Sequence, residues 1–249
     1  MKKKGSFLLP NTKGTIAQNI YADKASVILE WMLLNGVDKD LFSLREVSKE
    51  TGSSLGNAQA IFSSMVFNGY LKAIGIRTNK RFSVNNPHRL LRDWIGHYSI
   101  VDKCKIRSYS TAFSDKKQLI TALMKSGLQE SVVLALHSAA EAHKCKNTTM
   151  QQQLEFYLVQ PHLRQELEKV LKLQPKERGY DVLLIEPYYK SMINRSISQQ
   201  RQSSSIGLYH TPELLTFLDL YHFPLRGIEQ ADWMAQHMKS LKRIYKRRE

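Results

Sequence analysis

The sequence contains little cysteine and no long apolar run, and each absence argues against a class of protein. Cys104 and Cys145 are the only two cysteines among 249 residues, and neither belongs to a CxxC pair. This pattern indicates neither a disulfide framework nor a thiolate zinc site, and it fits a reducing compartment. The longest strictly aliphatic run, from Val132 to Leu136, is far shorter than the ~20 residues of a membrane-spanning helix.

The N-terminus carries no pattern of a secretion signal. The sequence MKKKGSFLLP starts with basic residues, as a signal peptide does, but its apolar stretch stops after three residues, at Pro10. Together with the absence of a spanning segment, this predicts a soluble cytoplasmic protein with no membrane partner.

Catalytic motifs are absent from the sequence as well. There is no phosphate loop of the form GxxxxGK followed by Ser or Thr, no GxSxG and no HExxH. Asp181 and Glu186 flank a predicted strand, as in some metal nucleases, but no lysine follows Glu186 two residues later. His137, His143 and Cys145 lie close in sequence, but no second cluster accompanies them as a metal site requires. We therefore expect no catalytic residue, no metal and no cofactor, and we interpret the chain as a non-enzyme.

Positive charge is abundant by comparison. The chain has 37 Lys and Arg against 22 Asp and Glu, a formal charge of +15 and a pI near 9.7. The excess is spread over the whole sequence rather than gathered in one segment. Such a charge favours a polyanionic partner, most commonly nucleic acid, over the alternative of a merely soluble basic protein.

The first regular pattern follows an N-terminal arm. Residues 1–22 contain glycine and proline without a sustained apolar period, which predicts a flexible arm with little structure of its own. From Lys24 to Leu33, apolar residues recur every three or four positions and predict a helix that ends at Asn35-Gly36.

A helix-turn-helix is predicted next. Ser43 and Glu46 form a capping-box pattern at the start of a short helix. Gly52 interrupts this helix, and Ser53 or Ser54 can cap a longer one, whose predicted buried stripe is Leu55, Ala58, Phe62 and Met65. Two helices separated by a turn of this kind make a helix-turn-helix.

A hairpin is predicted directly after the second helix. Two short β-like runs, Tyr70–Ile74 and Arg81–Val84, surround the basic turn Arg77–Lys80. A hairpin in this position is typical of a wing, and Asn86-Pro87 begins a closing helix. Residues 23–101 are therefore predicted to form a winged helix-turn-helix domain.

Residues 102–249 are predicted to form a second, mixed α+β domain, so that the whole chain belongs to the α+β class. The patterns predict strands at 106–109, 154–159 and 180–185, helices at 115–125, 131–143 and 161–173, a mobile loop at 196–205, and later helices beginning at Thr211 and Ile228. The last helix leads into a basic tail, Lys239, Lys242, Arg243, Lys246, Arg247 and Arg248. A solvated end and a contact with DNA or RNA both remain open for this tail.

Candidate DNA-binding residues follow from the predicted winged helix. Exposed positions early in the second helix lie nearest the base edges of the major groove and are the predicted base-reading residues: Ser54, Asn57, Gln59, Ala60 and Ser63. Basic residues of the first helix and the wing are the predicted phosphate-binding residues: Arg45, Lys49, Arg77, Lys80 and Arg81. The second helix has no Lys or Arg, which keeps open the alternative that this unit binds another protein.

Several separated segments resemble the AbiE-type antitoxins of type IV toxin–antitoxin systems. In the predicted winged helix they are Phe42–Val47, Ser54–Asn57, Gly69–Leu71 and Arg89–Trp94, and later in the chain they are Gly179–Leu184, Thr211–Leu215, Leu218–Tyr221 and Arg226–Ala231. The resemblance implies a transcriptional regulator that represses its own promoter through the winged helix. It also implies a C-terminal domain that counters a nucleotidyltransferase toxin, with or without direct contact.

Other interpretations stay open beside this one. A plasmid or phage replication or partition protein would use the same winged helix, but it would need a second DNA-binding module in residues 102–249, where none is predicted. A metal-dependent nuclease would need a cluster of carboxylates. Asp219, in the segment Leu218–Tyr221, is interpreted as a buried partner of Arg226 rather than as a catalytic residue.

Overall fold

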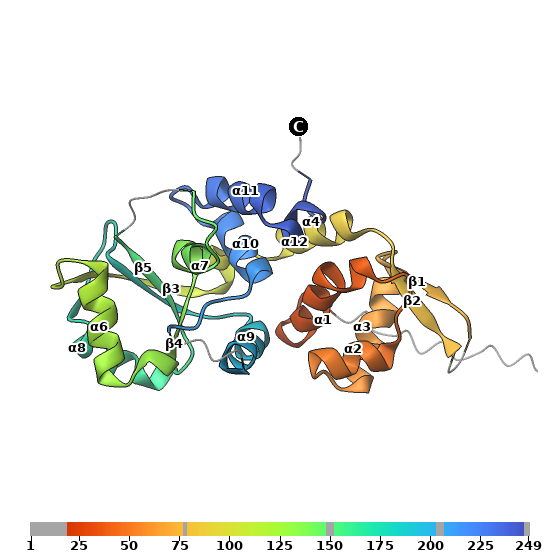
Figure 1. The fold of residues 1–249 in the computed structure, drawn as a ribbon, viewed down its shortest axis with the longest axis horizontal. Coiled ribbons are helices and arrows are strands. Elements are labelled where there is room, and N and C mark those ends of the chain that lie inside the picture. Colours follow the sequence, from red (N-terminus) through yellow and green to blue (C-terminus); the bar gives the residue numbers. More distant parts are fainter. Residues whose placement is uncertain (1–18, 77–78, 148–151, 203–206, 247–249) are drawn as a thin grey trace, which may run out of the picture.

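The computed structural model describes residues 19–76, 79–147, 152–202 and 207–246. Within them the protein is a mixed α+β structure with a two-stranded sheet and a five-stranded sheet (Figure 1). The N-terminal elements are α1 (Asp23–Leu34), the 3-10 turn η1 (Gly36–Asp38), α2 (Leu44–Thr51), α3 (Leu55–Phe67), β1 (Leu71–Ile74), β2 (Arg81–Val84), α4 (Pro87–His97) and α5 (Ile100–Lys103).

Local signals set the ends of α2 and α3. The capping box is present: Ser43 Oγ accepts a hydrogen bond of 3.1 Å from the Glu46 amide, and the Glu46 carboxylate accepts one of 3.3 Å from the Ser43 amide. Gly52 ends α2 with a φ of 69°, a left-handed conformation that glycine adopts without strain. Ser54 then caps α3 by accepting from the Asn57 amide at 3.3 Å. Strands β1 and β2 pair antiparallel, with Leu71 opposite Val84 and Ile74 opposite Arg81.

The five-stranded sheet lies in the C-terminal half, in the order β4-β5-β7-β3-β6. Strands β5 and β7 pair parallel, and the other neighbours pair antiparallel. The strands are β3 (Lys105–Thr111), β4 (Val132–Leu134), β5 (Leu154–Leu158), β6 (Leu173–Pro175) and β7 (Val182–Glu186). The helices around them are α6 (Lys116–Ser126), α7 (Leu136–Ala142), α8 (Arg164–Val170), α9 (Lys190–Gln202), α10 (Glu213–His222), α11 (Gly227–His237) and α12 (Lys239–Lys242), with the 3-10 turns η3 (Gln129–Ser131) and η4 (Pro161–Leu163).

Both faces of this sheet are covered, which explains why its central strands are apolar at almost every position. Phe156 and Leu184 pack into one cluster with α6 and α8. Tyr157 and Ile185 belong to the other cluster, with α7 and α10. Successive side chains of a strand point to opposite faces, so a strand buried on both sides loses the alternation of apolar and polar residues.

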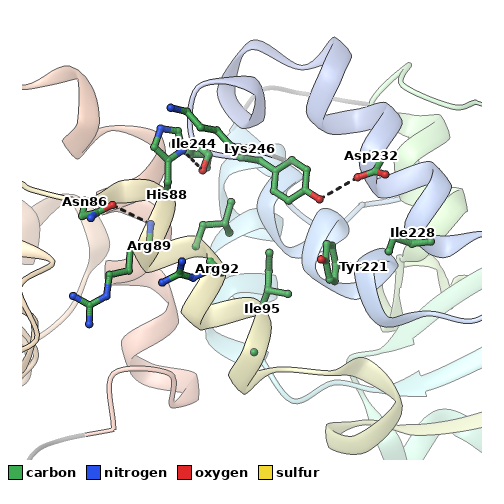
Figure 2. Close-up of a pocket in the computed structure, with 13 residues that line it drawn as sticks. Asn86, His88, Arg89, Arg92, Ile95, Tyr221, Ile228, Asp232, Ile244 and Lys246 are labelled. Carbon is green, nitrogen blue, oxygen red and sulfur yellow. Dashed lines mark hydrogen bonds between the residues drawn. The ribbon is translucent and has the colours of Figure 1, made fainter. Parts of the chain in front are cut away.

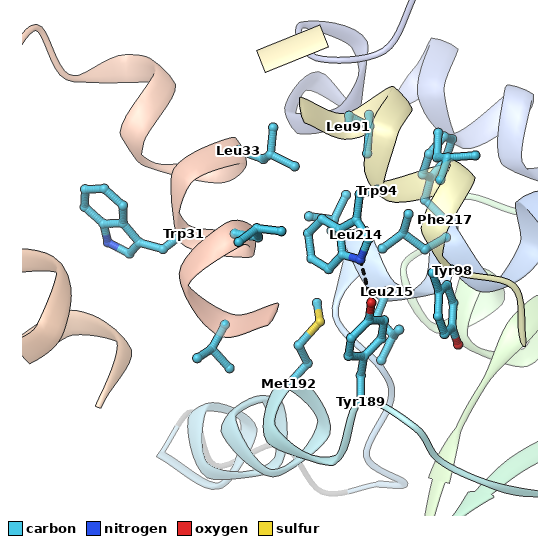
Figure 3. Close-up of a cluster of buried hydrophobic side chains, with 14 of the residues drawn as sticks. Trp31, Leu33, Leu91, Trp94, Tyr98, Tyr189, Met192, Leu214, Leu215 and Phe217 are labelled. Carbon is cyan, nitrogen blue, oxygen red and sulfur yellow. Dashed lines mark hydrogen bonds between the residues drawn. The ribbon is translucent and has the colours of Figure 1, made fainter. Parts of the chain in front are cut away.

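The larger hydrophobic cluster extends across the predicted domain boundary. It includes Trp31 of α1 and Trp94 of α4 together with Phe217 of α10 (Figure 3). The Trp94 indole N–H donates a hydrogen bond of 2.7 Å to the hydroxyl of Tyr189, at the start of α9 (Figure 3). Helix α9 also lies against α1, where the Asp23 carboxylate accepts hydrogen bonds from both the amide and the hydroxyl of Ser191 at 2.8 Å. The two halves therefore share one continuous core.

Three elements differ from the sequence-based predictions because tertiary pairing overrides local pattern. The helix predicted at 131–143 is interrupted, since Val132–Leu134 pairs with β5 at the edge of the sheet and only Leu136–Ala142 is helical. The helix predicted at 161–173 ends at Val170, because Leu173 enters β6 and pairs with Thr111. The final helix is broken at Met238, which has extended backbone between α11 and α12.

The mobile loop predicted at 196–205 is wrong over its first part. Helix α9 continues to Gln202, and Ser196 and Ile197 are buried in it. The Ser196 hydroxyl donates to the His210 carbonyl at 3.1 Å. The polar composition of this segment therefore reflects hydrogen bonding against the segment before α10. Residues 203–206 lie outside the described residues.

Asp219 is buried, but the prediction that it pairs with Arg226 is wrong. Its carboxylate accepts hydrogen bonds from the hydroxyls of Tyr98 at 2.6 Å and Tyr157 at 2.9 Å. Arg226 is exposed at the N-terminal cap of α11, with a φ of 66°. The sequence interval from Asp219 to Arg226 crosses a sharp turn, so nearness in sequence does not bring these two side chains together.

Candidate nucleic-acid interface

Helix α3 presents one exposed face opposite its buried stripe. Gly56, Gln59, Ser63 and Phe67 are exposed at spacings of three and four residues, whereas Ala58, Ile61, Phe62 and Met65 are buried. The Gln59 side-chain amide donates to Ser63 Oγ at 3.3 Å. This face is neutral and carries hydrogen-bonding groups beside an apolar residue, Phe67, that is 85% exposed.

A first groove brings together four of the predicted DNA-binding residues. Arg45 of α2, Gln59 of α3, and Lys80 and Arg81 at the start of β2 line one hollow of about 410 Å³. Its other lining residues are Ser43, Leu44 and Phe82, so no acidic side chain lines it. We call this hollow the wing groove.

Glu46 forms the capping box with Ser43, a lining residue of the wing groove, and its carboxylate pairs with Lys39. The ammonium group of Lys39 lies 2.5 Å from Glu46 Oε1. The hydrogen bond from Lys39 lowers the pKa of Glu46 below its ordinary value, and the charge of Arg81 acts in the same direction. Glu46 therefore stays ionised beside a cation of its own, and the positive charge of Arg45, Lys80 and Arg81 is left to attract an anion.

A second groove lies on the other side of the α3 N-terminus. It holds about 560 Å³ and brings Ser54 and Asn57 together with Lys24 of α1 and Arg195 of α9. Lys24 is exposed, and Arg195 pairs with Glu30 at 3.2 Å. We call this the α9 groove. Lys24 and Arg195 were not predicted as site residues: Arg195 lies far along the chain, and only the packing of α9 on α1 brings it here.

Three further predicted residues, Lys49, Ala60 and Ser63, line neither groove. Lys49 is exposed on the last turn of α2, and Ser63 is exposed on α3. Ala60 is half-buried and carries no polar group. Arg77 lies outside the described residues.

Leu55 is more exposed than the sequence pattern predicted. It was expected in the buried stripe of α3, but it is 50% exposed. As the first residue of the helix it precedes the segment that packs against α2, so helical spacing alone assigns it to the wrong face. In sequence it follows Ser54, which lines the α9 groove.

The two acidic residues considered for a nuclease do not converge. Asp181 precedes β7 and Glu186 ends this strand of 5 residues, so their Cα atoms lie roughly 16 Å apart at ~3.3 Å per residue. Asp181 accepts a hydrogen bond from the Thr111 amide at 3.2 Å, and Glu186 pairs with Arg107 at 2.6 Å. Across the described residues, no three His, Cys, Asp or Glu side chains are grouped so as to hold a metal ion.

Among the helices of the described residues, none combines the length and the apolar composition needed to cross a bilayer.

Comparison with known proteins gives no relative for this arrangement. The chain matches no protein-family model, and neither a curated protein nor a solved structure matches it.

Proposed function

We propose that residues 23–101 form a winged helix-turn-helix that binds duplex DNA. Helices α2 and α3, joined by the turn at Gly52, supply the two helices, and the hairpin of β1 and β2 follows as the wing. In this arrangement α3 enters the major groove, while the wing contacts the neighbouring backbone. Residues 102–249 then form the C-terminal α+β domain.

The wing groove is the single observation that carries this proposal. Three cations, Arg45, Lys80 and Arg81, line the same groove as Gln59 of the exposed face of α3. Duplex DNA presents phosphates on both sides of the base edges, so a protein that binds it needs cations beside a base-reading side chain.

Base recognition then rests on neutral side chains. Gln59 and Asn57 can each bond adenine through a side-chain amide, and Ser54 and Ser63 can contact either kind of base pair. Leu55, exposed at the start of α3, adds an apolar contact suited to the methyl group of thymine. Affinity comes from the surrounding cations, which contact phosphates without distinguishing sequences.

We also propose a cytoplasmic transcriptional regulator without enzymatic activity, which counters a nucleotidyltransferase toxin. This part rests on the resemblance to the AbiE-type antitoxins. Co-expression tests it: growth arrested by a nucleotidyltransferase toxin of this class should be restored by the intact chain. No restoration with any such toxin, alongside intact DNA binding, would remove the antitoxin role and leave the regulator.

The DNA-binding proposal is tested with the full chain and a matched control. Fluorescence anisotropy measures the affinity for duplex DNA of the unchanged protein, of the triple variant Arg45→Ala, Lys80→Ala, Arg81→Ala, and of the control Lys117→Ala, Lys125→Ala, Lys169→Ala. The control removes the same charge from exposed positions on α6 and α8. We expect the first variant to lose most of the affinity and the control to retain it. Equal losses in both would show that only the net charge attracts DNA.

A further inference from the structure

A cleft of about 700 Å³ lies away from both grooves, between α4 on one side and α10, α11 and the segment after α12 on the other (Figure 2). Its volume is that of a site for a small organic ligand. We call it the α4 cleft. None of the predicted DNA-binding residues lines it.

Apolar and aromatic side chains line the α4 cleft. Among the apolar ones, Ile228 of α11 is 50% exposed, whereas Leu91 and Ile95 of α4 and Ile244 are buried. The rings of Tyr221 and Tyr245 lie 6.3 Å apart at an angle of 76°. In Figure 2, Ile95 faces Tyr221 and Ile228 across the cleft. A flat ring placed here would contact the half-buried ring of Tyr221 and the exposed side chain of Ile228.

Two cations at the same cleft can accept an anion. Arg92 is 57% exposed and uses its Nε to contact Asp93 at 3.3 Å, while its terminal nitrogens donate to no described residue. Lys246 is exposed and forms no ion pair with another described residue. Arg89 also lines the cleft, but its guanidinium lies over the ring of Tyr70 at 5.3 Å.

A hydrogen-bond acceptor completes the α4 cleft. The Tyr245 hydroxyl donates to Asp232 Oδ1 at 3.1 Å (Figure 2). A carboxylate accepts more than one hydrogen bond, so Asp232 can also accept from an amino group of a ligand. The cleft thus combines ring surface, a carboxylate acceptor and an anion-binding edge.

We propose that the α4 cleft binds a nucleotide. The base packs on Tyr221 and Ile228, an amino group of the base donates to Asp232, and the phosphates contact Arg92 and Lys246. A simple inorganic anion would use only the cations, and an apolar ligand only the walls, whereas a nucleotide uses all three features. The nucleotide is either free or the terminal unit of a single strand, because both present the same base and phosphate.

Calorimetry on the full chain tests this inference. The titrants are ATP, GTP, CTP, UTP, inorganic tripolyphosphate and a short single-stranded RNA with a 5′ phosphate. We expect at least one nucleotide to bind, and Tyr221→Leu to weaken it about 5- to 100-fold, the range of a lost base–aromatic contact. Tyr221→Phe should retain the affinity, and Arg92→Gln should weaken nucleotide and tripolyphosphate alike. Arg178→Gln, an exposed change outside the cleft, is the matched control.

The two possible sources of the nucleotide are separated by the same titrations. Tighter binding of the RNA than of any free nucleotide assigns the cleft to a strand end, and the reverse assigns it to a free nucleotide. Two outcomes overturn the proposal: no nucleotide or strand binds with a Kd of about 1 mM or lower, which is a binding free energy of about −4 kcal/mol, or binding is unchanged in both Tyr221→Leu and Arg92→Gln. Thermal unfolding of each variant establishes that it is folded.

Discussion

The hydroxyl of Tyr98, just after α4, donates a hydrogen bond of 2.6 Å to the buried carboxylate of Asp219 on α10. Tyr157 on β5 donates a second one at 2.9 Å. Burial raises the pKa of Asp219 from 3.8 to about 7, while the two hydrogen bonds lower it in part. This carboxyl group joins the segment after α4, the central sheet and α10, so its protonation affects the stability of the whole fold.

We predict that Asp219 makes the protein less stable as the pH rises. Between pH 3.8 and about 7 the folded state keeps the Asp219 proton that the unfolded state has lost. Below this window Asp219 makes its full contribution to the free energy of unfolding. As the pH rises through the window this contribution is lost, which lowers the free energy of unfolding by about 4 kcal/mol at ~1.4 kcal/mol per pKa unit. Urea unfolding at about pH 4 and pH 8 measures the change.

The variant Asp219→Asn isolates this group from others that titrate in the same range. Burial also raises the pKa of Glu30 to about 7, so the unchanged protein has more than one source of pH dependence. The difference in the free energy of unfolding between the unchanged protein and Asp219→Asn should therefore change between about pH 4 and pH 8, because only the unchanged protein titrates at this position. Parallel curves for both would contradict the assignment to Asp219.

We predict that Lys80→Ala weakens DNA binding equally for every sequence. Each phosphate contact releases counterions, so the slope of log affinity against log salt should fall by about 0.9 when one contact is lost. Salt titrations on two unrelated duplexes measure it, with Lys117→Ala as the control of equal charge. An unchanged slope for Lys80→Ala would remove this residue from the interface.

We predict a different effect at the base-reading positions. Asn57→Ala, Gln59→Ala and Leu55→Ala should leave the salt slope unchanged and reduce the preference for a selected site over scrambled DNA by about 1–3 kcal/mol. Competition assays give this preference after a site has been selected from random duplexes. Full discrimination in all three variants would mean that α3 does not distinguish bases.

Tyr189→Phe should weaken the connection between the two halves. The Tyr189 hydroxyl accepts from the Trp94 indole at 2.7 Å and donates to the Tyr21 carbonyl at 3.0 Å. Its removal leaves a buried donor unsatisfied and should cost about 1–3 kcal/mol. Denaturant unfolding followed by tryptophan fluorescence and by circular dichroism should give one coincident transition. Two separate transitions would contradict a shared core.

Local sequence signals were sufficient to predict the structure where it depends on contacts between residues that are close in sequence. Ser43 and Glu46 satisfy each other's amides within one helical turn, and the hairpin of β1 and β2 pairs neighbouring segments. Such features need only a few consecutive residues, so the mixed α+β class and the helices around Gly52 follow from the pattern. Arg45, Gln59, Lys80 and Arg81, which were singled out from the sequence, line one groove, while their role in binding DNA stays a prediction.

Contacts between distant residues were not predictable in the same way. The apolar run at Val132 fits a helix equally well, and only its pairing with β5 makes it a strand. Arg195 meets the α3 N-terminus because α9 packs on α1, and a single sequence holds no sign of that packing. The partners of Asp219 were missed for the same reason, since Tyr98 and Tyr157 come from other elements.

The hydrogen bonds from Ser191 to Asp23 span 168 residues of sequence, and this separation matters while the protein is being made. At roughly 5–20 residues per second, the ribosome adds α9 about ten to thirty seconds after α1. During that interval the side of α1 that will face α9 remains uncovered. A premature stop codon after residue 101 would leave it uncovered permanently, and the shortened product should be a target for chaperones and proteases.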